Sequence, residues 1–180
     1  NTVGLAKAIA KLRLSSPKIK IILTHGHYDH IAGVNALCEN FDVEAIYIGK
    51  NEEKHLYFPS LSLSKMLGAD YTCEKNKGKV KCLIEGDKFN VGKYEFRVID
   101  TPGHTVGGVM YVCDSEKIVF SGDSLFKGSI GNTSFPGGDH DQLIASLKRA
   151  VTMIPDDFTV YPGHDESTTI GAEKASNPYL

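Results

Sequence analysis

The chain has 180 residues, of which 41% are hydrophobic and 23% charged, and its formal net charge is −2 at pH 7. This length and composition are typical of one globular domain with its own core. The near-neutral charge indicates neither a nucleic acid nor an anionic membrane as partner. No apolar run approaches the roughly 20 residues that cross a bilayer. The sequence predicts no particular oligomeric state.

The first half of the sequence alternates between helical and strand patterns. Apolar residues recur at helical spacing in two stretches, and two short runs are rich in β-branched residues. The expected elements are, in chain order, a helix over 3–13, a strand over 18–23, a helix over 31–39, a strand over 43–48 and a helical start at 51–54. Residues 55–79 are rich in lysine, and we expect them to be irregular.

The second half begins with strand patterns, two of them joined by a turn at Asp114–Lys117. A glycine-rich loop and an amphipathic helix follow. The expected elements are strands over 94–100, 107–113 and 118–121, a loop over 126–138, a helix over 142–151 and a strand over 158–161. Since strands and helices alternate, we predict a layered α/β architecture.

Histidine and aspartate residues gather in four short segments, each directly after a predicted strand. The densest is Thr24–His30, which holds three histidines and one aspartate. Binding crevices in open α/β sheets form at the carboxyl ends of strands, so we expect the four segments to meet at one edge. The side chains concerned are His25, His27, Asp29, His30, His104, Asp123 and His164.

Neutral imidazole and carboxylate are common protein ligands of zinc, iron and manganese. We predict two divalent cations, with zinc favoured and iron or manganese as alternatives. His25, His27 and His104 would hold the first; Asp29, His30 and His164 would hold the second, with Asp123 bridging. Two cations that share a water lower its pKa, so that a bridging hydroxide forms near neutral pH. His55 and His140 lie outside the pattern, and we expect both at the surface.

The four cysteines, Cys38, Cys73, Cys82 and Cys113, form no C-x-x-C pair and lie outside the four segments. We interpret them as reduced thiols of a cytoplasmic protein, not as metal ligands.

The segment His25–His30 resembles the H-x-H-x-D-H signature of the metallo-β-lactamase superfamily. Residues 101–105, 121–123 and 161–164 resemble its later motifs in the same order, and 126–131 resembles its glyoxalase II branch, as does the closing segment Gly171–Pro178. The resemblance implies an αββα sandwich with the metal site at one edge, the two ligand sets given above, and a single domain over residues 1–180. The family opens with strands before its first helix, so we expect some N-terminal strands to be lacking.

Two departures concern the substrate. Asn132 stands where glyoxalase II enzymes carry a basic residue that grips a glutathione carboxylate, and Ser134 replaces an aromatic residue. We also expect no C-terminal helical domain of the kind that completes their glutathione site. Lys127, which could supply a substitute cation, and Asn132 are therefore the candidate substrate-binding residues.

The leading hypothesis is a binuclear metal-dependent hydrolase, a thioesterase of glyoxalase II type that acts on a small-molecule thioester. A metal-bridging hydroxide would attack the carbonyl carbon while Asp29 holds its proton. The resemblance implies that Asp123, instead of a cysteine, disfavours the activity of the best-known zinc β-lactamases. Two alternatives are a mononuclear iron persulfide dioxygenase-like oxidoreductase and a truncated domain that binds metal but is inactive. The number of metal ions per chain separates the first alternative from the hydrolase.

Overall fold

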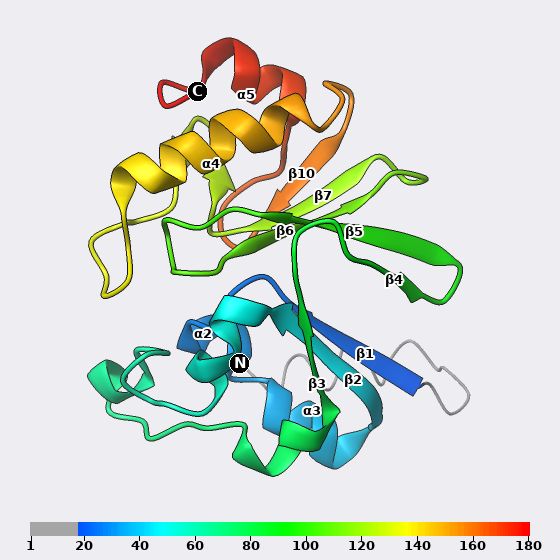
Figure 1. Cartoon of the computed structure of the whole chain (residues 1–180), viewed down its shortest axis with the longest axis vertical. Helices are drawn as coiled ribbons and strands as arrows, with labels where there is room; N and C mark the ends of the chain where they lie inside the picture. The colour runs from blue at the N-terminus through cyan, green and yellow to red at the C-terminus, as the bar shows by residue number, and fades with distance from the viewer. Residues whose placement is uncertain (1–17) are drawn as a thin grey trace.

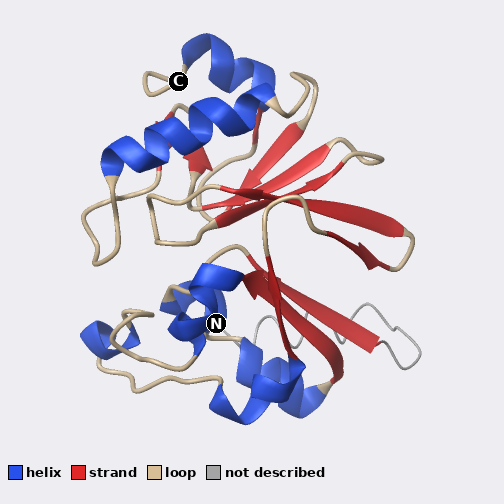
Figure 2. Ribbon diagram, in the orientation of Figure 1, coloured by secondary structure: helices blue, strands red, loops and turns tan. Residues whose placement is uncertain are grey.

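The computed structural model describes residues 18–180, so the helix expected over 3–13 lies outside the described residues. The described part forms two facing β-sheets with helices on their outer sides, as Figure 1 and Figure 2 show. This is the predicted αββα sandwich.

The smaller sheet has three parallel strands in the order β1-β2-β3. Their bounds are Lys18–Leu23, Asp42–Gly49 and Val80–Leu83. Parallel neighbours need a crossover connection, which α2 (Tyr28–Ile31) and α3 (Val34–Asn40) provide between β1 and β2. The predicted helix over 31–39 is thus two short helices, because the chain turns at Ala32 and Gly33.

The connection from β2 to β3 contains three 3₁₀ helices. They are η1 (Lys50–Leu56), η2 (Ser64–Leu67) and η3 (Glu74–Lys79). The prediction that 55–79 is irregular was therefore wrong for residues 55–56, 64–67 and 74–79. Contacts distant in sequence support these turns; for example, the Tyr71 hydroxyl donates to the carbonyl of Ile31 at 3.0 Å. Short 3₁₀ turns give no long apolar period, which is why the sequence pattern missed them.

The larger sheet has six strands in the order β11-β10-β7-β6-β5-β4. Four of the strands were predicted, although β4 and β11 were not. The bounds are β4 Lys88–Val91, β5 Tyr94–Asp100, β6 Val109–Cys113, β7 Ile118–Gly122, β10 Thr159–Pro162 and β11 Thr168–Thr169. A small hairpin of β8 (Leu125–Phe126) and β9 (Ser129–Ile130) follows β7, inside the region expected to be a loop.

Two helices cover the outer face of the larger sheet: α4 (His140–Thr152), as predicted, and α5 (Ile170–Ser176). Asp139 caps α4 by accepting a hydrogen bond from the Gln142 backbone at 2.9 Å. The buried apolar residues form one cluster under each outer layer and a third between the sheets. Stacked Tyr47 and Phe89, with ring centroids 4.5 Å apart, belong to the cluster between the sheets.

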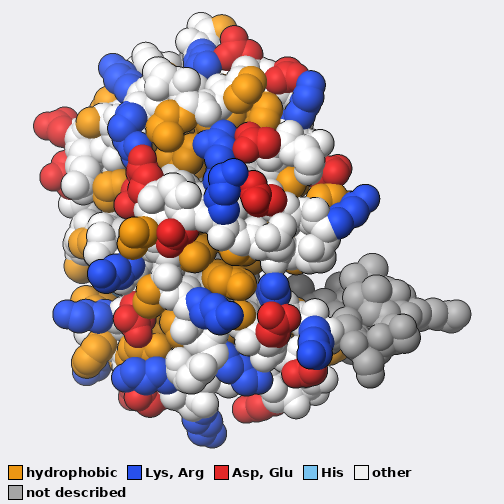
Figure 3. Space-filling model, turned by 45° about the vertical axis from the view of Figure 1, so that its right-hand side comes forward, with side chains coloured by type: hydrophobic (Ala, Val, Ile, Leu, Met, Phe, Trp, Pro, Cys, Tyr) orange, Lys and Arg blue, Asp and Glu red, His pale blue; other side chains and the backbone are white. Residues whose placement is uncertain are grey.

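The surface of the described part carries charges of both signs. Figure 3 shows lysine and arginine side chains mixed with aspartate and glutamate over the face that it draws. Among residues 18–180, no helix is long and apolar enough to cross a membrane. All four cysteines have free thiols.

Candidate metal centre

The histidines of the turn after β1 lie on two kinds of backbone and so point in different directions. His25 and His27 lie on an extended segment and are buried, whereas Asp29 and His30 belong to α2, which begins one residue after His27. Successive side chains of a strand-like segment and of a helix point differently, so one short motif can supply two neighbouring positions. The three later segments follow β5, β7 and β10 and reach the same edge of the sandwich.

All seven predicted side chains come together at this edge. Within each of three groups, the possible ligand atoms lie within 4.8 Å of one another. The groups are His25, His27 and His104; His25, His30 and Asp123; and Asp29, His30 and His164. The first and third groups are the two ligand sets expected from the sequence, and the second joins them.

Asp123 lies between the two sets. Its Oδ1 is 3.3 Å from Nε2 of His30, and its Oδ2 is 3.8 Å from Nε2 of His104 and 3.6 Å from Nε2 of His164. One carboxylate thus reaches residues of both sets, which is the position that a bridging ligand requires. In the second ligand set, that of Asp29, His30 and His164, Nε2 of His164 lies 3.1 Å from Oδ2 of Asp29.

The buried atoms that face the middle of this cluster lack hydrogen-bond partners in the described part of the chain. Nε2 of His25, His27, His30 and His104 and Oδ1 of Asp123 are all buried, and none has a hydrogen-bond partner among residues 18–180. Buried nitrogen and oxygen atoms are nearly always paired, so several orphans that converge on one point need an explanation. Divalent cations satisfy imidazole and carboxylate atoms in such an arrangement, so the residues present fit two metal ions.

The environment keeps the deeper histidines neutral. Burial, followed by the nearby His30 and His104, holds the pKa of His25 well below its usual value. Burial and the nearby His104 lower the pKa of His27 to about 4. Burial also acts to lower the pKa of His30, but the carboxylate of Asp123 outweighs it and raises that pKa. Neutral imidazoles are the form that binds metal.

Comparison with known proteins identifies the family. Residues 6–164 match the family model described as the metallo-beta-lactamase superfamily. The chain belongs to this superfamily.

Relatives within the superfamily differ in what their names state. "Hydroxyacylglutathione hydrolase GloC" of Haemophilus influenzae is 35% identical over 160 residues, which is 89% of this chain and 74% of that protein. The structure of "BLEG-1 B3 metallo-beta-lactamase" has a TM-score of 0.89 at 36% identity, covering all of this chain and 84% of the other. That of "TTHA1623 in a di-iron-bound form" has a TM-score of 0.78 at 34% identity, covering 97% and 84%.

Glu52 supports two of the ligand-bearing loops of this superfamily member, and the sequence reasoning missed it. Its side chain is fully buried. Oε2 accepts a hydrogen bond from the backbone of Gly26 at 2.8 Å, and Oε1 accepts one from Gly107, also at 2.8 Å. One carboxyl group therefore ties the turn of His25 and His27 to the loop that follows His104. Groups behind the ligands fix ligand orientation in metal sites.

His55 was expected at the surface, and that prediction was wrong. Its ring is buried, with Nδ1 3.5 Å from Oε2 of Glu52. A Cβ on Gly26 would lie 2.2 Å from Cβ of His55, so the ring packs directly on the turn between the two ligands. By contrast, His140 is exposed, as expected.

Two further backbone contacts shape the centre. Nδ1 of His104 lies 2.7 Å from the carbonyl oxygen of Asn132, which leaves its Nε2 to face the cluster. Gly163 passes so close that a Cβ there would lie 2.3 Å from Oδ1 of Asp123 and 2.6 Å from Cε1 of His30. A side chain at this position would therefore displace residues of the proposed bridge.

The metal centre opens into a cavity of about 360 Å³. Its lining comprises His27, Tyr28, Asp29, Leu63, Met66, Leu67, His104, Asp123, Phe135 and His164. Lys127 and Asn132, the candidate substrate-binding residues, do not line it. The ammonium of Lys127 pairs with exposed Glu166 at 2.7 Å, and Oδ1 of Asn132 accepts from the backbone of Ser134 at 2.8 Å.

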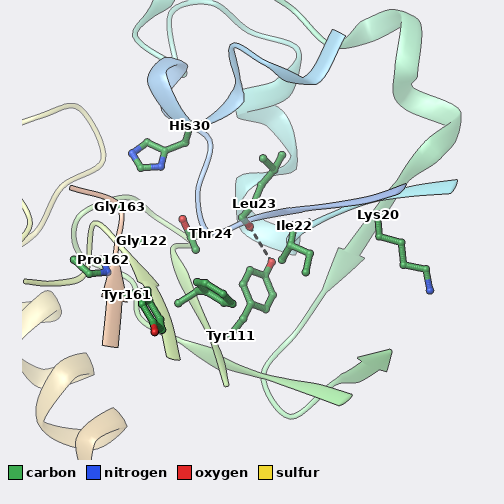
Figure 4. A pocket seen from close by; sticks show the side chains of 11 residues that line it. Lys20, Ile22, Leu23, Thr24, His30, Tyr111, Gly122, Tyr161, Pro162 and Gly163 are labelled. Carbon is green, nitrogen blue, oxygen red and sulfur yellow. Dashed lines mark hydrogen bonds between the residues drawn. The ribbon is translucent and has the colours of Figure 1, made fainter. Parts of the chain in front are cut away.

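A second cavity of about 370 Å³ touches the centre from the other side. Figure 4 shows the ring of His30 at one end of it and Lys20 at the other, with Tyr111 and Tyr161 along its wall. The Tyr111 hydroxyl donates to the carbonyl of Leu23 at 2.8 Å and so links the two sheets beside this groove.

Proposed function

We propose that this chain is a binuclear metal-dependent hydrolase that cleaves small-molecule thioesters, with zinc as the metal and His25, His27, Asp29, His30, His104, Asp123 and His164 as ligands. The observation that carries the proposal is the convergence of seven possible ligands in two sets joined by Asp123, five of which have a buried atom with no hydrogen-bond partner among the described residues. Two cations held there would activate a shared water and polarise the substrate carbonyl.

The residues around the centre have distinct tasks. Asp29 is about half exposed and is also a lining residue of the cavity, so its carboxylate can accept a proton from the attacking water. Asp123 and the buried histidines fix the position of the centre. Glu52 and the carbonyl of Asn132 act through other residues, because they hold the ligand loops and do not touch the cavity.

A thioester suits this set of side chains. A thiolate leaving group has a pKa of about 8.5 and needs little help from a general acid. The cavity lining contains no lysine or arginine. This agrees with the sequence, in which Asn132 stands where glyoxalase II enzymes carry a basic residue. The name of the Haemophilus influenzae relative, a hydroxyacylglutathione hydrolase, supports thioester chemistry. The cavity gives less support to glutathione itself as the thiol carrier.

Metal analysis and a substrate panel test the proposal together. Protein purified without added metal should hold two divalent ions per chain and should hydrolyse S-acyl derivatives of glutathione, coenzyme A or N-acetylcysteamine. Asp29→Asn should lower kcat by a factor of about 10² to 10⁴, the range of a lost general base. Two bound metals with no turnover of any thioester would instead favour the inactive-domain alternative. Because one neighbour is titled a B3 metallo-beta-lactamase, a β-lactam belongs in the panel; its hydrolysis in place of thioesters would contradict the proposal.

The oxidoreductase alternative has support for the identity of its metal but not for one ion per chain, since the related structure that names iron is a di-iron-bound form. Iron alone does not decide between the two chemistries, because imidazole and carboxylate ligands suit several metals. The persulfide dioxygenase alternative predicts one iron per chain and oxygen consumption with a persulfide. Two metals per chain and no oxygen consumption would exclude it.

A further inference from the structure

The outer wall of the metal-centre cavity is apolar and exposed. It is formed by Met66 and Leu67 of η2, which are 70% and 71% exposed, together with Leu63 and Phe135, which line the same cavity. Four of the nine exposed large apolar side chains in residues 18–180 lie between positions 58 and 67. Apolar side chains that gather on a surface beside a cavity are typical of binding sites.

The segment that carries this wall is held in place. The backbone N–H of Tyr28, a neighbour of two proposed ligands, donates to the carbonyl of Ser62 at 2.8 Å. The hydroxyls of Ser62 and Ser64 are buried and lie 3.3 Å apart. Leu63 adopts a left-handed conformation, with φ of 64°, which non-glycine residues rarely do. Such a backbone persists where surrounding contacts impose it and is common at ligand sites.

Phe135, the fourth residue of this wall, is held by an aromatic contact. The ring of Phe135 meets the ring of His27 edge-on, with centroids 5.6 Å apart. The apolar surface therefore continues from η2 to a proposed metal ligand. A substrate whose carbonyl lies at the metal centre would place an adjoining substituent against this wall, away from water.

We infer that the wall formed by Leu63, Met66, Leu67 and Phe135 binds an apolar substituent of the substrate and so sets chain-length preference. The inference rests on the proposed function for the position of the carbonyl. Burying one methylene group is worth about a fourfold gain in affinity. Each methylene that reaches the wall should add up to this factor, and the gain should end when the cavity of about 360 Å³ is filled.

Two series of probes test the inference without turnover. Straight-chain alkyl hydroxamic acids of two to eight carbons place the chain on the acyl side, and alkanethiols of the same lengths place it on the thiol side. Binding to the metal-loaded chain is measured by calorimetry. Affinity should rise with length in one series, which identifies the side that the wall serves. Affinities independent of length in both series, or no binding of the six-carbon probes, would overturn the inference.

Paired variants locate the effect. Met66→Ser combined with Leu67→Ser should reduce the gain per methylene to below twofold while the two-carbon probe binds as before. Phe58→Ser combined with Leu61→Ser is the matched control, because these exposed residues of the same segment do not line the cavity. Equal length dependence in both double variants would contradict the inference. If thioesters are not hydrolysed but probe affinity still rises with chain length, the proposed function fails and the inferred role of the wall in binding stands.

Discussion

Glu52→Gln is the most informative single substitution, because it alters no proposed ligand and keeps the size of the side chain. The carboxyl group of Glu52 accepts two backbone hydrogen bonds of 2.8 Å, from Gly26 and Gly107. A glutamine retains one acceptor oxygen, but its amide nitrogen would face the other backbone N–H. One of the two loops must therefore lose its anchor.

The size of the effect follows from burial. Glu52 has no exposed surface, so water cannot replace the lost partner. A buried donor left unsatisfied costs about 1–3 kcal/mol, and a hydrogen bond to a charged group contributes about 1.5–3 kcal/mol. We expect Glu52→Gln to lower the free energy of unfolding by about 2–4 kcal/mol. Loss of a group behind the ligands typically weakens metal binding about 10- to 100-fold, and we expect the same here.

Urea denaturation and metal titration measure the two effects. The control is Glu53→Gln, the same change one residue away, where the carboxyl group accepts a long hydrogen bond of 3.5 Å from the Tyr57 hydroxyl and lies beside the Cys82 thiol, without anchoring a ligand loop. This control should change the free energy of unfolding by no more than about 0.5 kcal/mol. The reasoning is refuted if Glu52→Gln binds metal as tightly as the original chain, or if the two variants lose equal stability.

Three further predictions concern the centre itself. Gly163→Ala should weaken the binding of at least one metal ion tenfold or more, measured by calorimetry, because its Cβ would lie 2.3 Å from Oδ1 of Asp123. The control Gly78→Ala should bind metal as the original chain does, because no atom of another segment lies within 4 Å of the new Cβ. Metal-free protein should become less stable to urea as the pH falls from 6.5 to 4, because His25 and His27 bind protons in the unfolded chain but stay neutral in the folded one. His27, with its pKa of about 4, should account for about 3 kcal/mol of the lost free energy of unfolding. Rising stability over this range would refute the prediction. Restoring metal at 1,000 times its dissociation constant should stabilise the chain by about 4 kcal/mol at neutral pH, and an unchanged melting temperature would show that no tight site exists.

The ligand cluster could be predicted because its information is local. Each segment directly follows a strand whose apolar residues are readable from the sequence, as with β1 before His25 and β10 before His164. Once the strands belong to two facing sheets, their ends share one edge. The division of the ligands into two sets could also be predicted, because the change from an extended segment to α2 separates the side chain of His27 from that of Asp29.

Other features depend on contacts that no local pattern encodes. Glu52 and Glu53 are adjacent and chemically identical, yet only Glu52 reaches Gly26 and Gly107, which lie 26 and 55 positions away. β3 was missed because its apolar pattern is short and two of its four residues are exposed; it forms by parallel pairing with β2. η2 likewise depends on tertiary contacts.

The separation between ligands and cavity wall has a consequence for specificity. The ligands come from segments that follow β1, β5, β7 and β10, whereas Met66 and Leu67 come from the connection between β2 and β3. Within this connection, Glu52 of η1 supports the ligand loops through Gly26 and Gly107, whereas the segment that carries Met66 and Leu67 is joined to them by the hydrogen bond from Tyr28 to the carbonyl of Ser62. Substitutions in the wall can therefore change which substituent binds while the metal ligands stay in place. The ligand motifs thus place the chain in its superfamily, whereas the inferred role of the apolar wall assigns substrate preference to the β2–β3 connection.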